Sequence, residues 1–244
     1  MRASAIEFRL RMVINLSLIF LGFWSPWLGP GKHTILLEWL PVQLSRLGLI
    51  SFGAGVTAVQ IAAGVLAALG VLLRVWGSAC LGPSTVSNLS MMAGTVVASG
   101  PFRYTRNPLY LGLWFMVAAL AFLMPPSGAL CTIVLISFFL IRLTLGEESF
   151  LAGQLGEPYE AYLHSVPRFF PRLRNALPPN TARPQWVRSI LAELTPIGIF
   201  VAFAFLSWSY NGTLMLRVIL VSFGLSLVSR ALMPQAPGEP TSTA

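Results

Sequence analysis

The chain has 244 residues, of which 55% are hydrophobic and 10% are charged, and its formal net charge is +8. Soluble domains carry about 25% charged residues, so the composition excludes an ordinary soluble globular protein. The positive charge comes almost wholly from arginine, because Lys32 is the only lysine. No basic strip with interleaved aromatic residues occurs outside the loops near the membrane, and we expect no nucleic-acid partner. The composition instead predicts an all-α, polytopic membrane protein.

Several apolar runs approach the roughly 20 residues that span a bilayer. No short cleavable segment with an A-x-A site is present, so we interpret the first run as a retained span. We expect about six transmembrane helices, at residues 12–28, 48–73, 108–124, 129–145 and 190–208, with a last one ending near 232. Pro125-Pro126-Ser127-Gly128 predicts a tight turn between the third and fourth spans, and Asn211-Gly212 predicts a turn between the last two.

The arginines predict the orientation of these spans. With the N-terminus in the cytosol, thirteen arginines lie at or near the cytosolic face, and only Lys32 and Arg46 lie in an outer loop. This bias satisfies the positive-inside rule and places both termini in the cytosol, in a bacterial inner membrane or the endoplasmic reticulum. Cys80 and Cys131 then lie on opposite membrane sides, so we expect free thiols.

Two polar blocks flank the predicted hairpin of the third and fourth spans. GPFRYTRNPLYLG opens at Gly100, and GEESFLAGQLGEPYEAYLHSVPRFFP ends at Pro171. The hairpin returns the chain to the side that it left, so both blocks can face one cytosolic site. We divide the chain into N-terminal helices (1–68), a core with the hairpin (69–173), a linker with two C-terminal helices (174–233) and a disordered tail (234–244).

Asn107-Pro108 predicts a helix start, because asparagine suits the N-cap and proline the first helical position. Around it lie Arg103, Tyr104, Arg106 and Tyr110. A positive helix terminus with such neighbours suits an anion or carboxylate. The alternative is that these residues only anchor the chain at the membrane interface.

Glu147-Glu148 is predicted to end an apolar helix, where the helix dipole disfavours negative charge, so a cation should compensate. Adjacent helical residues point about 100° apart, so one glutamate can pair with an arginine while the other faces a cleft. Arg142 is an ionisable group within a span and hence a functional candidate. The alternative is a solvated helix end. An amphipathic interfacial segment, interrupted at Gly156, is expected to follow and to end at Pro167.

Other chemistries have no motif in this sequence. His33 and His164 are the only histidines and neither has a second ligand at useful spacing, so we expect no metal site. There is no GxSxG, no Walker loop and no GxGxxG after a strand.

The blocks resemble the isoprenylcysteine carboxyl methyltransferase and phospholipid methyltransferase superfamily of integral membrane enzymes. Its patterns LVxxGPYRYxRHPxYxG and EExxLxxxFGxxYxxYxxxVPRFxP are similar to VVASGPFRYTRNPLYLG and EESFLAGQLGEPYEAYLHSVPRFFP, in the same order across a hairpin. Upstream, LGVLLRVWGSACLG resembles LGxxLRxWAxxxLG. The resemblance covers roughly residues 69–173.

The resemblance implies S-adenosylmethionine as the cofactor, held near the cytosolic face. The cofactor-binding residues that it implies are Val96, Val97, Phe102, Asn107, Pro108, Leu109, Tyr110 and Glu147. It also implies that Arg142 orients a substrate carboxylate, and we assign Arg142 to catalysis and both Arg142 and Arg168 to substrate binding. Two residues depart from the family pattern, because Asn107 and Gly94 each replace a histidine.

These features predict methyl transfer to an isoprenylcysteine-like carboxylate or another lipophilic acceptor, with membrane lipids as further partners. A carboxylate acceptor is ionised at neutral pH and needs no general base, so catalysis would be positioning. The alternatives are a phospholipid amine N-methyltransferase, a sterol-reductase-like enzyme that uses NADPH, and a non-catalytic membrane scaffold. The paired glutamates favour a cationic sulfonium over an anionic dinucleotide.

Overall fold

The computed structural model describes residues 3–24, 34–82, 98–172, 183–209 and 212–232. Within these ranges the chain forms helices and no strand, which confirms the all-α expectation. The elements are α1 (Ala5–Arg9), α2 (Arg11–Phe23), α3 (Leu36–Arg46), α4 (Phe52–Leu81), the short 3₁₀ helix η1 (Gly100–Arg103), α6 (Pro108–Ala121), α7 (Pro126–Leu155), α8 (Glu157–Ser165), α9 (Trp186–Ala192), α10 (Leu194–Ser209) and α11 (Gly212–Leu232). The predicted turn at Asn211, the end of the first span and the tail lie outside the described residues.

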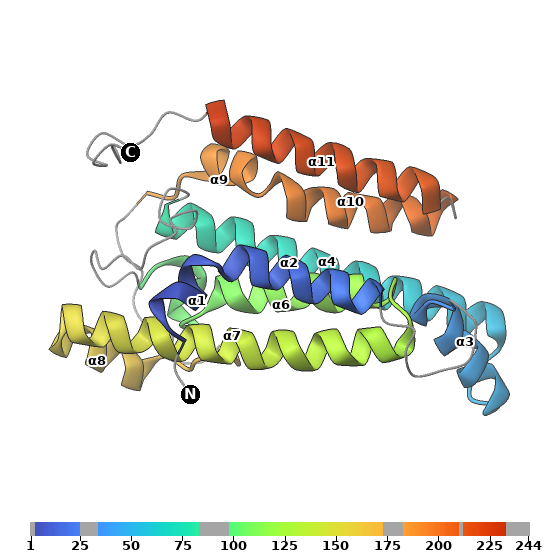
Figure 1. Cartoon of the computed structure of the whole chain (residues 1–244), viewed down its shortest axis with the longest axis horizontal. Coiled ribbons are helices and arrows are strands. Elements are labelled where there is room, and N and C mark those ends of the chain that lie inside the picture. Colours follow the sequence, from blue (N-terminus) through green and yellow to red (C-terminus); the bar gives the residue numbers. More distant parts are fainter. Residues whose placement is uncertain (1–2, 25–33, 83–97, 173–182, 210–211, 233–244) are drawn as a thin grey trace.

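The long helices run side by side along the long axis of the molecule (Figure 1). Helix α4 packs on α6, α2 packs on α7, and the α10–α11 hairpin packs on α4 through α10. One buried cluster joins Phe8, Val117 and Leu143 across α1, α6 and α7, and another joins Ala67, Met116 and Phe203 across α4, α6 and α10. Apolar side chains thus bind successive layers together.

The α4–α6 contact is close because glycines face each other. A Cβ atom on Gly70 would lie 3.0 Å from the Gly112 carbonyl oxygen, and a Cβ on Gly112 would lie equally close to the Gly70 carbonyl oxygen. Small residues of this kind allow helix backbones to approach in membrane proteins.

Two helices of the described residues, α4 and α7, are long and apolar enough to cross a membrane. A third span is present if α9 and α10, which are bent by 69° at their break, form one crossing. Helices α2 and α6 and residues 217–229 of α11 are apolar but shorter. The described residues therefore contain two or three candidate membrane spans, and the six-span layout remains a prediction.

Several predicted boundaries are wrong because hydropathy marks where apolar residues stop and not where a helix stops. Helix α4 continues to Leu81 instead of Leu73, and α7 continues to Leu155 instead of Leu145. Helix α7 ends only at Gly156, whose φ of 59° favours glycine. The predicted tight turn is also shifted, since Pro126 already begins α7. Helix α3, a further helix at 36–46, was not predicted.

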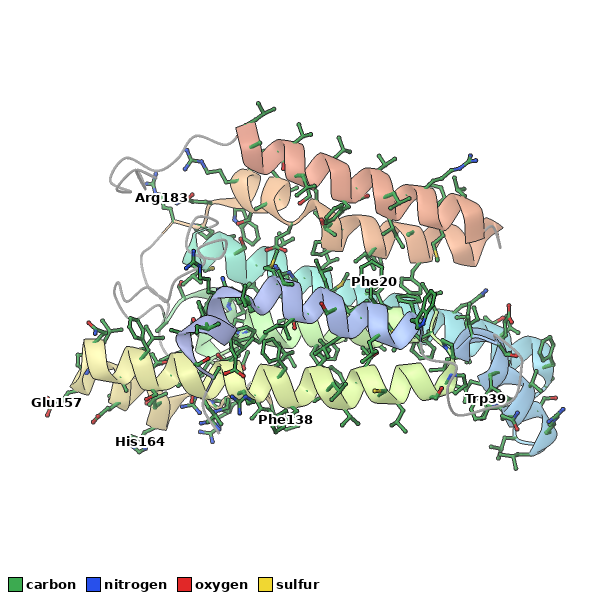
Figure 2. The ribbon with its side chains drawn as sticks, in the orientation of Figure 1. Phe20, Trp39, Phe138, Glu157, His164 and Arg183 are labelled. Atoms are coloured by element: carbon green, nitrogen blue, oxygen red, sulfur yellow. The ribbon has the colours of Figure 1, made fainter. Side chains whose placement is uncertain are left out.

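The polar elements gather toward one end of the molecule. Helix α8 lies at the end opposite α3, and α1 lies toward the α8 end (Figure 1). Among the labelled side chains, Glu157 and His164 mark the first end and Trp39 marks the second (Figure 2). The candidate site lies where α6 begins and the polar part of α7 runs past it.

Candidate functional site

The structure brings the two polar blocks into direct contact, as the hairpin argument predicted. The backbone N–H of Arg106 donates to the Pro167 carbonyl over 2.9 Å, and that of Arg172 donates to the Tyr104 carbonyl over 3.0 Å. The Tyr162 hydroxyl donates to the Phe102 carbonyl over 2.8 Å. Residues about 60 positions apart in sequence are thus held together by hydrogen bonds as well as by packing.

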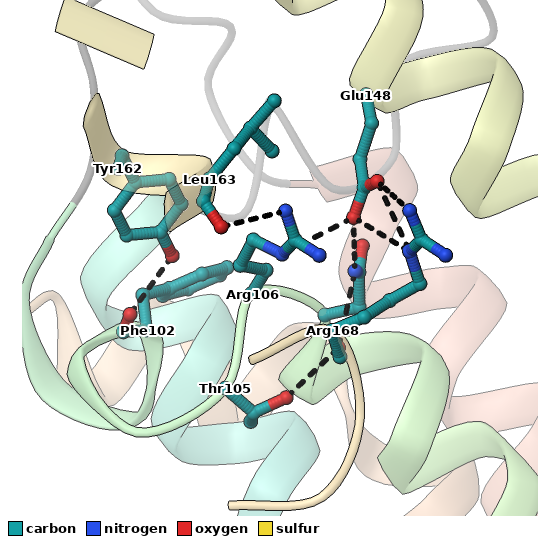
Figure 3. Close-up of polar contacts among 8 residues, drawn as sticks. Phe102, Thr105, Arg106, Glu148, Tyr162, Leu163 and Arg168 are labelled. Carbon is teal, nitrogen blue, oxygen red and sulfur yellow. Dashed lines mark hydrogen bonds and ion pairs between the residues drawn. The ribbon is translucent and has the colours of Figure 1, made fainter. Parts of the chain in front are cut away.

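Glu148 is the centre of this contact (Figure 3). Arg168 donates to both of its carboxylate oxygens, with Nη2–Oε2 at 2.8 Å and Nε–Oε1 at 3.2 Å. Arg106 approaches with its Nε 3.4 Å from Oε1. The Glu148 side chain is only 8% exposed. A buried carboxylate with two guanidinium partners joins α7, the start of α6 and the segment after α8.

The pKa values of nearby groups outside the spans agree with this arrangement. The pKa of Arg168 is raised, first by its hydrogen bond to Glu148. The pKa of Tyr159 is raised by burial and then by the charges of Glu148 and Glu147. Tyr159 is therefore a neutral phenol at any physiological pH.

Asn107 occupies the N-cap position of α6 but does not cap the helix with its side chain. Its Nδ2 instead donates to Glu148 Oε1 over 3.3 Å and to the Arg168 carbonyl over 3.2 Å. The expectation of a capping side chain is therefore wrong, because the two hydrogen bonds from Nδ2 orient the side chain toward Glu148 and Arg168 and its oxygen caps no backbone N–H. The two amide hydrogens are both used, which leaves the side-chain oxygen as the group that can face a ligand.

Glu147 has a different environment from its neighbour. Glu147 and Glu148 lie nine and eight residues before Gly156, within one continuous helix. The expectation that they end the helix, and the dipole argument built on it, is therefore wrong. Glu147 forms a hydrogen bond with the Tyr110 side chain, and Arg11 of α2 contributes positive charge nearby. Glu147 and Tyr110 thus meet in the structure.

Arg142 forms an ion pair with a third glutamate. Its Nη2 lies 2.9 Å from both carboxylate oxygens of Glu7 on α1. Its backbone carbonyl accepts a hydrogen bond of 3.0 Å from the Ala3 N–H. The compensating cations for the glutamate pair are instead Arg168, Arg106 and Arg11.

Of the remaining predicted cofactor-binding residues, some lie in the described helices and others lie outside the described residues. Phe102 is buried in η1 and Pro108 begins α6, as predicted for a helix start. Leu109 faces Gly77 of α4, where a Cβ atom would lie 3.0 Å from the leucine side chain. Val96, Val97 and Gly94 lie outside the described residues.

Three features were missed at the sequence level. The sequence patterns assign no role to Glu7. They also do not predict that Glu148 and Arg106 form an ion pair. Arg74 forms a two-bond ion pair with Glu193, at 2.7 and 2.9 Å, and Glu193 is only 1% exposed. An isolated acid within an apolar C-terminal run was the available signal for Glu193.

Comparison with known proteins gives one match. Residues 59–157 match the family described as phospholipid methyltransferase. The matched segment contains most of α4 together with η1, α6 and α7, that is, the hairpin and its supporting helix. No curated protein and no solved structure matches the chain. The match confirms the resemblance to the integral membrane methyltransferase superfamily, and this family implies a membrane methyltransferase.

Proposed function

We propose that the protein is an S-adenosylmethionine-dependent methyltransferase that acts on a lipophilic acceptor, with an isoprenylcysteine-like carboxylate as the leading candidate. The observation that carries this proposal is the contrast between the two adjacent glutamates. Glu148 is enclosed by two guanidinium groups, whereas the hydrogen-bond partner of Glu147 is a neutral phenol. Because this donor is neutral, a cationic ligand bound beside Glu147 would favour the charged form of its carboxylate.

The residues present fit such a cofactor. S-adenosylmethionine would supply a methyl group on a cationic sulfonium, together with an ammonium group. Glu147 would hold the positive charge, and Tyr110 would keep its carboxylate oriented. The side-chain oxygen of Asn107 would accept from a donor on the ligand, since its amide hydrogens already serve Glu148 and Arg168. Val96, Val97, Phe102, Pro108 and Leu109 remain proposed lining residues.

The chain's own contribution to the reaction would be positioning. A carboxylate acceptor is already ionised near neutral pH, so its attack requires alignment and the exclusion of water and no general base. Arg142 would orient this carboxylate, and Arg168 would contribute mainly by fixing Glu148. We propose that the site faces the cytosol, where the cofactor is available and where the arginine bias places both blocks.

Binding of the cofactor to the detergent-solubilised protein tests the proposal. Calorimetry should detect S-adenosylmethionine binding to the wild type and no binding of NADPH. Glu147→Gln should lower the affinity by roughly tenfold or more, because a hydrogen bond to a charged group is lost. Glu157→Gln, an exposed glutamate of α8, is the matched control and should bind normally. Unchanged affinity in Glu147→Gln would remove the support for this site, and binding of NADPH alone would overturn the proposal.

The acceptor class is tested separately by methyl transfer. A farnesylcysteine analogue and phosphatidylethanolamine should be offered with the same labelled donor. We expect transfer to the carboxylate analogue. Transfer to the phospholipid amine alone would retain the methyltransferase and replace its acceptor.

A further inference from the structure

The first described residues form a short strap across the polar end of α7. We define the strap as residues 3–9, which contain α1. Its fold is fixed locally by a capping box, in which the Glu7 N–H donates to Ser4 Oγ over 3.2 Å and the Ser4 N–H donates to Glu7 Oε2 over 2.7 Å. The Glu7 carboxylate is therefore held at a defined place.

The Glu7 carboxylate lies against the guanidinium group of Arg142. Both Glu7 oxygens lie 2.9 Å from Arg142 Nη2. The strap backbone follows α7 closely, because Ala3 donates to the Arg142 carbonyl and a Cβ on Gly146 would lie 3.0 Å from the Ala3 carbonyl oxygen. Arg142 thus lies about one and a half turns before Glu147 on α7, and α1 brings Glu7 to it.

The strap does not depend on this ion pair for its position. Phe8 is buried in the core cluster with Leu140 and Leu143, and this apolar contact anchors α1 on the bundle. The side chains of Arg142 and Glu7 are 26% and 31% exposed, so neither group is enclosed by the protein. Partly exposed pairs contribute little to stability, which leaves the Glu7 contact free to exchange.

We propose that Glu7 sets the affinity of the site for carboxylates, because it occupies Arg142 as an internal carboxylate until an acceptor carboxylate displaces it. This inference rests on the proposed function, in which Arg142 orients the acceptor. A carboxylate that is tethered in place has a high effective concentration at its partner. A free carboxylate must therefore bring additional binding energy in order to replace it.

The consequence is an affinity threshold for membrane carboxylates. Free fatty acids carry a carboxylate and a chain but lack the further polar groups of a cysteine conjugate. Displacement of Glu7 lowers the affinity of every carboxylate by the same factor. A ligand with enough binding energy elsewhere therefore still occupies the site at concentrations at which a weaker carboxylate does not.

The test measures acceptor binding and does not need turnover. The affinities of a farnesylcysteine analogue, its carboxamide and oleate are measured by tryptophan fluorescence in mixed micelles. The proteins are the wild type, Glu7→Gln and Glu38→Gln, an exposed glutamate on α3 at the opposite end. Glu7→Gln should bind both carboxylates roughly fivefold more tightly or better, in the range of site–site coupling. The neutral carboxamide and the Glu38→Gln control should show no change.

Two further variants test whether the gain in carboxylate affinity depends on Arg142 and on the charge of residue 7. The gain should vanish in Glu7→Gln/Arg142→Gln, because the exchanged partner is absent. If Glu7→Gln does not fold, Glu7→Asp retains the charge on a shorter side chain and should give a smaller gain. Equal or weaker carboxylate binding in these variants, or an equal gain for the carboxamide, would overturn the inference. Tighter carboxylate binding without any methyl transfer would instead leave the inference standing and reject the proposed function.

Discussion

Glu147 and Glu148 are adjacent residues of one helix, yet they belong to two different environments. Glu148 joins three chain segments through Arg106, Arg168 and Asn107, and few of its hydrogen-bonding positions remain for a ligand. Glu147 meets a tyrosine, with one arginine nearby. The difference follows from the helix, because consecutive side chains point about 100° apart.

The comparison teaches how a membrane protein can hold a usable charge in a site. A buried carboxylate surrounded by cations stabilises a defined arrangement of segments, and removal of one partner leaves an uncompensated charge. A carboxylate that retains a neutral partner can instead change partners when a ligand arrives. We therefore expect stability to depend on Glu148 and ligand affinity to depend on Glu147.

The largest expected effect is on the stability of Glu148 variants. Glu148→Gln leaves Arg106 and Arg168 without their carboxylate, and it should lower the free energy of unfolding by about 3–5 kcal/mol. Denaturation in detergent, followed by circular dichroism, measures this loss. Glu147→Gln should change it by less than about 1 kcal/mol. Equal losses in both variants would abolish the proposed distinction between the two glutamates.

The Arg74–Glu193 pair extends the comparison to a second enclosed carboxylate. Glu193 lies at the break between α9 and α10, and Arg74 donates two hydrogen bonds to it. Arg74→Gln should destabilise the protein by about 3 kcal/mol, since Glu193 would remain buried without its cation. Arg188→Gln, at an exposed arginine on α9, is the control. The free energy of unfolding is measured by the same denaturation experiment. A negligible loss in Arg74→Gln would show that burial of a glutamate beside an arginine does not by itself make the pair important for stability.

The sequence predicted the helical class, the hairpin and the meeting of the two polar blocks, because these depend on hydropathy and on chain reversal. It did not predict that α7 continues through Glu147 to Leu155, since the end of an apolar run is not the end of a helix. Gly156 ends α7, although the sequence pattern predicts only an interruption of an interfacial segment there. The apolar run up to Leu145 gives the length of the predicted span but not the length of the helix.

Ion-pair partners were the least predictable part of the site. Arg142 lies about one and a half turns from Glu147 on one helix, but the carboxylate of its ion pair belongs to Glu7, 135 residues away in sequence. Similarly, Asn107 has the residue type and position of an N-cap but donates to Glu148. Partner choice among several arginines and glutamates depends on tertiary packing, which local patterns do not encode.

A smaller effect is expected for substitutions of Asn107. Asn107→Asp would replace two hydrogen-bond donors with a carboxylate beside Glu148, and it should cost about 1–3 kcal/mol of stability. Asn107→His, the residue of the family pattern, retains an N–H and should be less costly. Thermal unfolding of both variants checks this order. A stable Asn107→Asp variant would indicate that the Glu148 cluster tolerates a further negative charge.

The smallest effect concerns Glu7, a third carboxylate that is more exposed than either Glu147 or Glu148. The pKa of Glu7 is lowered, first by its hydrogen bond from the Ser4 backbone and then by Arg142. A lowered pKa in the folded protein stabilises it above the pKa of an unfolded glutamate, about 4.3, and this stabilisation is lost as the pH falls through the folded value. We therefore expect the unfolding midpoint of the wild type to decline slightly more than that of Glu7→Gln as the pH is lowered from about 6 to about 3. Thermal unfolding at a series of pH values measures this difference, with Glu38→Gln as the control that should follow the wild type. If the two curves for wild type and Glu7→Gln remained parallel over this range, the Glu7–Arg142 contact would contribute nothing to the folded state in solution, and Glu7 could not compete with an acceptor for Arg142.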